Sequence, residues 1–210
     1  MNFQSKAVVR AARPVLLVAL LPFTACVSVT ANSHRTTNGS GSAATNSNAA
    51  APITEAQVNA AQQAWCDGLV KISQTHAKGG DAKAEAAKMI DEQYDYAEGK
   101  VFFKPTLAYG SRTFRPTREG ALSYFVGGNP NFPEDTGFAL KGWTKSRFDN
   151  NAAENGIQIH GDIAITMGNV YFTGPDGKEI MVDKTFVFRR CKDGTLRLCV
   201  HKSALPFNPN

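Results

Sequence analysis

A hairpin near the C-terminus carries the residues best suited to chemistry. The dipeptide Asp-Gly at 193–194 is a two-residue turn signal between two segments of alternating apolar residues. That turn sets Phe186 opposite His201, and two residues further along it sets Lys184 opposite Ser203. His201 can exchange protons near neutral pH, because an imidazole has an ordinary pKa of about 6.5. A histidine and a serine beside phenylalanine rings are typical of polar groups that line a mostly apolar pocket.

The same register assigns the remaining residues of the hairpin to its two faces. Phe188 pairs with Cys199 and shares the face of His201, and a one-residue bulge would invert this assignment. Taken alone, His201 fits a hydrogen-bonded residue near a strand end better than a catalytic residue. The residues that alternation turns away from His201 are Leu196, Leu198 and Val200.

Helices are expected before the hairpin. Thr54 can cap a helix whose apolar residues, from Val58 to Ile72, recur at steps of three or four and which ends at the glycines 79–80. A second helix is expected from about Asp81 to near Gly99. The segment 101–104 is typical of a strand, and a short helix follows between Thr117 and the glycines 127–128.

The second half of the chain predicts an antiparallel meander. Helices followed by a run of long strands indicate the α+β class, with a curved antiparallel sheet covered by the N-terminal helices to form a cone with a pocket inside. The expected strands are 138–148, 156–160, 162–173, 179–191 and 196–203.

The N-terminus has the pattern of an export signal. Residues 1–25 join a cationic stretch to the apolar segment from Val15 to Ala25, which is too short to cross a bilayer as a folded helix. Small residues directly before Cys26 favour a bacterial lipoprotein signal with a lipidated Cys26, and cleavage after Ala31 is the alternative. Val27 is not the Asp of inner-membrane lipoproteins, so we expect the periplasm, with an outer-membrane anchor and no other membrane contact. The residues 26–52 are rich in Ser, Thr, Asn, Gly and Ala and predict a disordered tether before a folded domain at 53–210.

The net charge gives little support for nucleic-acid binding. The 210-residue chain has 23 basic and 18 acidic residues, a net charge of +5. Three of the basic residues, Lys6, Arg10 and Arg13, lie in the export signal, so the rest of the chain has 20 against 18 and no dense basic stripe. With 42% hydrophobic residues, the chain can form one packed core.

Several segments resemble the iota-class carbonic anhydrases. The likeness runs in order from about residue 55 to residue 207 with short gaps, through FKPTLA (103–108), FRPTREGALSYFVGG (114–128), FPEDTGFALKGWTK (132–145), GDIAITMGNVYFT (161–173), VDKTFVFRR (182–190) and HKSALPF (201–207). The resemblance implies a nuclear transport factor 2-like fold, shared with SnoaL-like proteins, in a secreted bacterial member. It also implies reversible hydration of carbon dioxide to bicarbonate, the reaction of a lyase.

The resemblance also suggests a site. The family's Thr and Tyr fall on Thr106 and Tyr124, and its first His and first Ser fall on His201 and Ser203. Two positions depart from the family signature, because Lys202 stands in place of a second His and Ala204 in place of a second Ser. The three hydroxyls can orient a water and the developing bicarbonate oxygens. The phenylalanines expected to form a dry slot for the apolar gas are Phe102, Phe125, Phe186 and Phe188.

A metal-independent route is expected for this chemistry, with no cofactor. His34, His76, His160 and His201 include no pair at a close ligand spacing. Because some members of the family have been described as metal-dependent, zinc or manganese stays open as a minority alternative.

Three cysteines follow Cys26, and their state is left open. The hairpin register puts Cys191 and Cys199 on opposite faces, so Cys66 with Cys199 is the preferred disulfide, and a reduced, buried Cys66 is an equal alternative. The acids at 134–135 are expected in a solvated loop rather than as a general-base pair.

Two other function classes are kept beside the carbonic anhydrase hypothesis. One is an isomerase or cyclase for a larger organic molecule, and the other is a non-catalytic periplasmic binding or assembly module, since fold does not fix function. A homodimer is expected, because this fold commonly dimerises through its open sheet.

Overall fold

The computed structural model describes residues 51–209, and its first element is the long helix α1 (Glu55–Ala77). Thr54 caps this helix as expected: its hydroxyl accepts a hydrogen bond from Gln57 N (3.3 Å), and the Gln57 side chain accepts one from Thr54 N (3.0 Å). Its buried face includes Val58, Trp65, Leu69 and Ile72, the apolar positions that the periodicity identified. The predictions for residues 1–50, including lipidation of Cys26, lie outside the described part.

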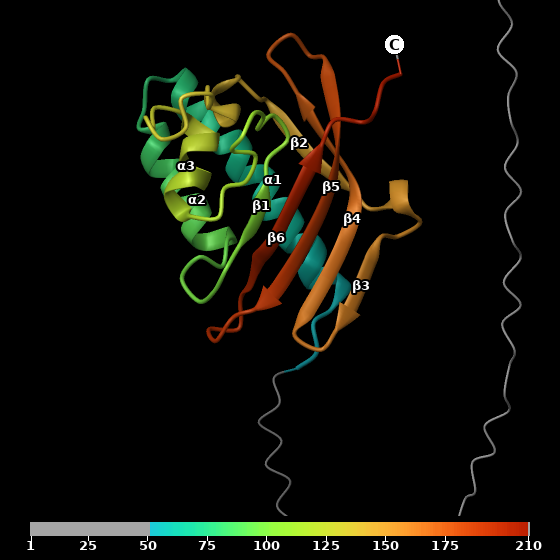
Figure 1. The fold of residues 1–210 in the computed structure, drawn as a ribbon. Helices are drawn as coiled ribbons and strands as arrows, with labels where there is room; N and C mark the ends of the chain where they lie inside the picture. Colours follow the sequence, from blue (N-terminus) through green and yellow to red (C-terminus); the bar gives the residue numbers. More distant parts are fainter. Residues whose placement is uncertain (1–50, 210) are drawn as a thin grey trace, which may run out of the picture. The chain divides into compact units, whose positions relative to one another are not determined.

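Two shorter helices follow. Helix α2 (Ala82–Gln93) begins at the Asp81 cap but ends before Tyr94, earlier than the expected end near Gly99. Helix α3 (Arg118–Val126) begins at Thr117, whose hydroxyl accepts from Gly120 N, and ends at Gly127, which has a φ of +67°. Helix α1 lies along one face of the sheet, while α2 and α3 gather beside β1 at one end (Figure 1). No helix within residues 51–209 is long and apolar enough to span a bilayer.

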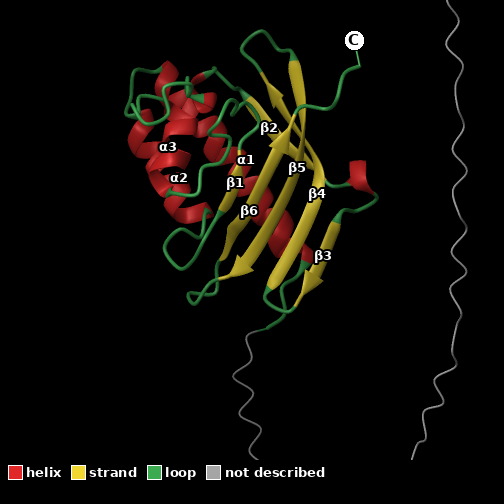
Figure 2. Cartoon of the chain, in the orientation of Figure 1, coloured by secondary structure: helices red, strands yellow, loops and turns green. Residues whose placement is uncertain are grey.

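The sheet is curved and does not close into a barrel. Its order is β1-β6-β5-β4-β2, and β3 also pairs with β4 (Figure 2). All pairs are antiparallel except β1 with β6, which is parallel. A parallel pair at this edge is possible because a long stretch of chain, rather than a tight turn, separates the two strands. The strands are β1 (Phe102–Lys104), β2 (Lys145–Asp149), β3 (Ile157–His160), β4 (Ile163–Thr173), β5 (Glu179–Arg190) and β6 (Leu196–Ala204).

The strand expected at 138–148 is partly wrong. Its first part is a short 3-10 helix, η1 (Phe138–Leu140), and only Lys145–Asp149 joins the sheet; a second short 3-10 helix, η2 (Asn151–Ala153), leads to β3. Trp143 fixes this turn, because its indole N–H donates to the Phe138 carbonyl (2.8 Å) and its backbone N–H donates to Ser73 of α1 (2.9 Å). Buried tertiary contacts therefore override the local strand pattern.

The core lies between α1 and the concave face of the sheet. Trp65 meets Phe186 and Phe172 edge-on, with ring centroids 5.4 Å and 6.3 Å apart. Every second residue of β4 from Ala164 to Phe172, and of β5 from Val182 to Phe188, is buried in this layer, and the residues between them are more exposed. The polar side chains of the candidate site point into the same layer.

Candidate functional site

The final hairpin contains a bulge that the sequence analysis did not assign. Its turn has one residue more than expected, because Cys191 N donates to the Thr195 carbonyl (2.8 Å) and Gly194 has a φ of +83°. The strands therefore start one position out of the expected register, with Phe188 opposite Leu198. A bulge opposite Val187 and Phe188 absorbs Cys199 and shifts the register by one.

The two deviations cancel beyond the bulge. Phe186 faces His201 and Lys184 faces Ser203, as expected. Near the turn the expectation is wrong, because Leu198, rather than Cys199, pairs with Phe188 and is buried in the core. The bulge thus lets Leu198, His201 and Ser203 all face inward from one strand.

His201 is buried between two polar partners. Its Nδ1 lies 2.8 Å from Tyr94 Oη, and its Nε2 lies 2.9 Å from Lys184 Nζ. Trp65 Nε1 donates to the same Tyr94 oxygen (2.9 Å). Phe103 stacks on the imidazole with ring centroids 4.4 Å apart. Each imidazole nitrogen is therefore held by one neighbour, which fixes the orientation of the ring.

Three hydroxyl groups gather at the end of β6. Thr106 Oγ1 and Ser203 Oγ lie 2.6 Å apart, and either can donate. Tyr124 Oη accepts a hydrogen bond from Leu107 N (3.4 Å), so the phenol reaches the residue next to Thr106. Ser203 and Tyr124 are buried and Thr106 is half-buried, so Thr106 is the member nearest to solvent. The structure thus brings Thr106, Tyr124 and Ser203 together, with His201 two residues before Ser203 on the same face of β6.

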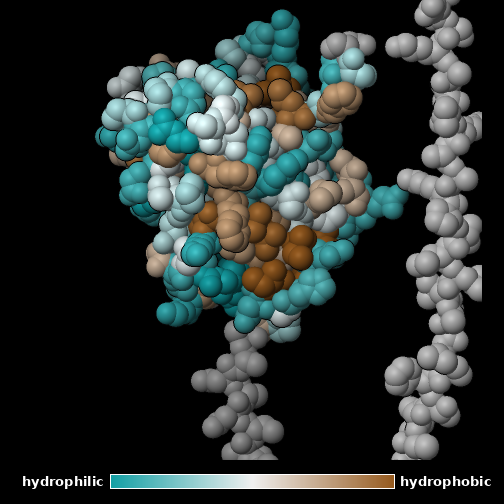
Figure 3. All heavy atoms as spheres, viewed as in Figure 1, coloured by the Kyte–Doolittle hydropathy of each residue, from teal (hydrophilic) through white to brown (hydrophobic). Residues whose placement is uncertain are grey.

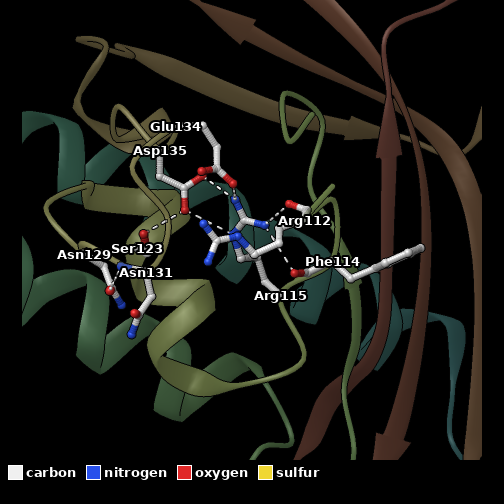
Figure 4. A network of polar contacts seen from close by, with 8 residues as sticks. All are labelled: Arg112, Phe114, Arg115, Ser123, Asn129, Asn131, Glu134 and Asp135. Atoms are coloured by element: carbon white, nitrogen blue, oxygen red, sulfur yellow. Dashed lines mark hydrogen bonds and ion pairs between the residues drawn. The ribbon is translucent and has the colours of Figure 1, made fainter. Parts of the chain in front are cut away.

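An ion-pair network fixes the helix that carries Tyr124. The buried Arg115 guanidinium donates from Nε (3.1 Å) and Nη2 (2.6 Å) to the two oxygens of Asp135, and it also reaches Glu134 Oε1 at 3.5 Å (Figure 4). Ser123 of α3 donates to the same Asp135 carboxylate (2.7 Å). The expectation of a solvated loop at 134–135 is therefore wrong, because Asp135 is needed to neutralise a buried arginine.

Burial sets the charge of the site. It lowers the pKa of Lys184 to about 7, and burial, with a smaller effect of Lys184, lowers the pKa of His201 well below 6.5. Burial also raises the pKa of Tyr124 to about 12, so this phenol keeps its proton at neutral pH. The expectation that His201 titrates near neutral pH is therefore wrong. Lys184, which lacks a carboxylate partner among the described residues, titrates there instead.

Phenylalanine rings form the apolar walls. Phe125, Phe186 and Phe188 are fully buried, as expected. Phe102 is wrong as a lining residue, because 68% of it is exposed, and its neighbour Phe103 points inward instead. The alternation of a strand allows only one of the two to face the core, and the pairing of Phe103 with His201 decides which.

The ligand-type residues do not gather around His201. Within residues 51–209, Asp95, Glu98 and Cys191 form a group that could hold a metal, and His201 is not part of it. The partners of His201 are the phenol of Tyr94 and the amine of Lys184. Neither group is a usual zinc ligand, so the surroundings of His201 do not resemble a zinc site. The cysteines do not support the preferred Cys66–Cys199 disulfide, because Cys66, Cys191 and Cys199 are free thiols.

Comparison with known proteins decides the family. Residues 56–205 match the family described as metal-independent carbonic anhydrase. A protein of that name from Nostoc sp. is 53% identical over 157 residues, which are 74% of this chain and 75% of the relative. The chain belongs to the metal-independent carbonic anhydrase family. The enzyme is accordingly a lyase, and the expected independence from metal is the description of the family as a whole.

One solved structure agrees with this assignment. The crystal structure of the iota-carbonic anhydrase from a cyanobacterium, complexed with bicarbonate, superposes with a TM-score of 0.71 at 51% identity and covers 75% of this chain and 94% of that chain. A nuclear transport factor 2-like superfamily protein from Salmonella enterica is 12% identical with a TM-score of 0.38, over 73% of this chain and 96% of that one, and a score this low carries no argument about function. The resemblance to the iota class is thus confirmed.

The sequence analysis missed three neighbours of His201 in this carbonic anhydrase. Lys184 could have been found, because the register that identified Ser203 sets Lys184 directly opposite it, on the face of Phe186. Trp65 was expected only as one of the apolar residues of the first helix. Tyr94 was expected only within the second helix, and nothing linked it to His201, which lies 107 residues away in sequence.

Proposed function

We propose that this carbonic anhydrase hydrates carbon dioxide at the Thr106–Ser203 pair, beside Tyr124 and His201. The observation that carries the proposal is the 2.6 Å contact of Thr106 and Ser203 beside a protonated phenol, inside an aromatic wall. Bicarbonate is the ligand of the solved relative with 51% identity, so the same anion is expected here as product.

Each group has a distinct task in this proposal. Thr106 and Ser203 can exchange donor and acceptor roles. Together the two hydroxyls can hold a water molecule by accepting hydrogen bonds from it, while the oxygen of that water attacks the carbon of carbon dioxide. Tyr124 donates a hydrogen bond to an oxygen of the carbon dioxide as negative charge develops on it. The phenylalanine walls exclude bulk water, which strengthens these hydrogen bonds. The proton released by the attacking water leaves to solvent or buffer.

Stopped-flow measurement of carbon dioxide hydration with a pH indicator tests the proposal. Protein consisting of residues 53–210 is compared before and after chelation, beside Tyr124→Phe and Ser203→Ala. Activity that survives chelation and falls about 100- to 1000-fold in the variants supports it. Tyr109→Phe, a change at an exposed loop tyrosine, is the matched control and keeps full activity. Activity that both variants retain in full contradicts the assigned roles.

We further propose a homodimer through the outer face of the sheet. An apolar row crosses four strands there, from Phe102 through Val200 and Val187 to Ile165. The open sheet face has a cluster of hydrophobic side chains at its surface (Figure 3), and Met167 beside this row is also exposed. Sedimentation of the wild type as a dimer and of Ile165→Lys as a monomer supports the proposal, with Tyr109→Lys as the surface control. A monomeric wild type contradicts it.

We also propose that the protein is exported and anchored in the outer membrane through a lipid on Cys26. The support is the cationic and apolar pattern of residues 1–25 with small residues before the cysteine. The full chain is expressed in a bacterial host that is fed a radioactive fatty acid. The wild type is expected to carry the label, and the Cys26→Ser variant is expected to lose it. An unlabelled periplasmic protein beginning at Asn32 would support the alternative cleavage after Ala31.

A further inference from the structure

Thr106 lies outside the regular part of the sheet, although its hydroxyl belongs to the Thr106–Ser203 pair. Strand β1 and its pairing with β6 end at Lys104. Residues 105–113 form an irregular loop with no strand pairing, and the chain returns to β1 where Arg115 N donates to the Phe103 carbonyl (2.8 Å). Since no strand pairing places the Thr106 hydroxyl beside Ser203, other contacts must do so.

The Lys104 side chain joins the two segments that carry the pair. Its Nζ donates to the Ser203 carbonyl (3.3 Å) and to the Thr106 carbonyl (3.4 Å). Phe103 points into the core, so strand alternation starts the half-buried Lys104 side chain on the outer face of the sheet. Among the hydrogen bonds of residues 51–209, none joins this ammonium to either hydroxyl. The lysine therefore contacts the backbone of the site and not its reactive groups.

The two carbonyls are the partners of this ammonium, because it has no acidic one. None of the ion pairs within the described part of the chain includes Lys104. Burial, with a smaller effect of the neighbouring Lys202, lowers the pKa of Lys104. A charged donor holds a carbonyl more strongly than a neutral donor does. Lys104 thus links the Thr106 loop to the end of β6.

Tyr124 provides a second attachment of the same loop. Its hydroxyl accepts a hydrogen bond from Leu107 N (3.4 Å), and contact with Thr106 lowers the Tyr124 pKa against the larger effect of burial. The loop is thus held by the phenol on one side and by Lys104 on the other. A displacement of about 1 Å at a reacting group can cost about 100-fold in rate, so the loss of one of two attachments should cost less.

We propose that Lys104 is a positioning residue for the hydration of carbon dioxide, a role that rests on the proposed function of the hydroxyl pair. Its ammonium joins the Thr106 and Ser203 carbonyls and so keeps the two hydroxyls in contact. The lysine touches neither carbon dioxide nor the attacking water, and it exchanges no proton in the reaction. Its loss lowers the fraction of molecules in which both hydroxyls can hold the water. The chemical step is therefore slowed, while the binding of carbon dioxide is not changed.

Lys104→Met tests this role, because it removes the donor and keeps a side chain of similar length. In stopped-flow assays kcat per subunit is expected to fall about tenfold, with KM for carbon dioxide within about twofold. Lys104→Arg, which keeps N–H donors, is expected to retain at least half of kcat. Lys202→Met is the matched control, since Lys202 lies opposite Lys104, is exposed and donates to neither carbonyl. Full activity in Lys104→Met, or an equal loss in Lys202→Met, overturns the proposal.

A double variant distinguishes positioning from a general loss of structure. Ser203→Ala already breaks the hydroxyl pair, so the addition of Lys104→Met is expected to lower kcat by less than about twofold. If Lys104 only supported the fold, the two losses would multiply. A further tenfold loss in the double variant therefore contradicts an action through the pair.

Hydrogen exchange separates this role from the proposed function, because it needs no activity. Exchange of the Leu107 amide, measured by NMR, is expected to be about tenfold faster in Lys104→Met and unchanged in Lys202→Met. Unchanged exchange in Lys104→Met overturns the positioning role even if the wild type hydrates carbon dioxide. A wild type without hydration activity contradicts the proposed function, and Lys104 is then overturned as a positioning residue for hydration, whatever the exchange shows.

Discussion

Replacement of Lys184 by methionine is expected to stabilise the protein at neutral pH and below, although it removes a polar group from the core. Burial lowers the pKa of Lys184 from 10.5 to about 7. This difference corresponds to about 5 kcal/mol of unfavourable free energy for the charged lysine in the folded state. Methionine fills a similar volume without a charge, and loss of the hydrogen bond to His201 costs about 1 kcal/mol. At pH 6 the variant is therefore expected to be about 4 kcal/mol more stable.

The pH dependence of this difference gives the sharper test. Below pH 7 both the folded and the unfolded wild type hold the Lys184 proton, so the full penalty is present. Between pH 7 and 10.5 only the unfolded chain holds it, and the stability of the wild type rises with pH. The advantage of the methionine variant is thus lost across this window. Other titrating groups are common to both proteins and largely cancel in the difference.

Urea denaturation at a series of pH values from 6 to 10 measures both proteins. Lys178→Met is the control, because the Lys178 side chain is 86% exposed and its replacement should give a small difference that does not vary with pH. A constant difference between wild type and Lys184→Met over the whole range would show that Lys184 titrates normally. The electrostatic argument for a neutral amine would then fail.

Three further predictions follow from the packing of the site. Phe103→Ala should lower stability by about 3 to 5 kcal/mol and impair hydration, because Phe103 is buried against His201. Phe102→Ala, at the exposed neighbour, should leave the hydration activity per subunit unchanged, and denaturation and stopped-flow assays compare the two variants. Asp135→Asn should destabilise the protein by about 3 to 5 kcal/mol, since it leaves the Arg115 charge buried without its main partner, and a loss below about 1 kcal/mol in urea denaturation would contradict this. Cys66 should resist a thiol reagent in the native protein and react after unfolding without reductant, because it is a buried free thiol with a pKa of about 11; fast native labelling of Cys66, located by mass spectrometry, would be inconsistent with this.

The sequence by itself determined most of the helices and strands, and the inward face of the hairpin beyond its bulge. The Thr54 and Thr117 caps, the periodicity of α1 and the alternation of β4 and β5 are local signals, because capping and burial depend on residues a few positions apart. The pairing of His201 with Phe186 was correct because a bulge at Cys199 compensates for a turn one residue longer than expected. The motifs that resemble the family supplied Thr106 and Tyr124, which no local pattern connects to β6.

Tertiary structure alone decided the chemistry around His201. Tyr94 and Lys184 reach the two imidazole nitrogens from the end of α2 and from β5, and the parallel pairing of β1 with β6 turns Phe103 rather than Phe102 inward. A pKa depends on how completely a group is removed from water and on the charges around it. For this reason the sequence assigned the neutral-pH titration to the histidine, whereas the packed core assigns it to the lysine.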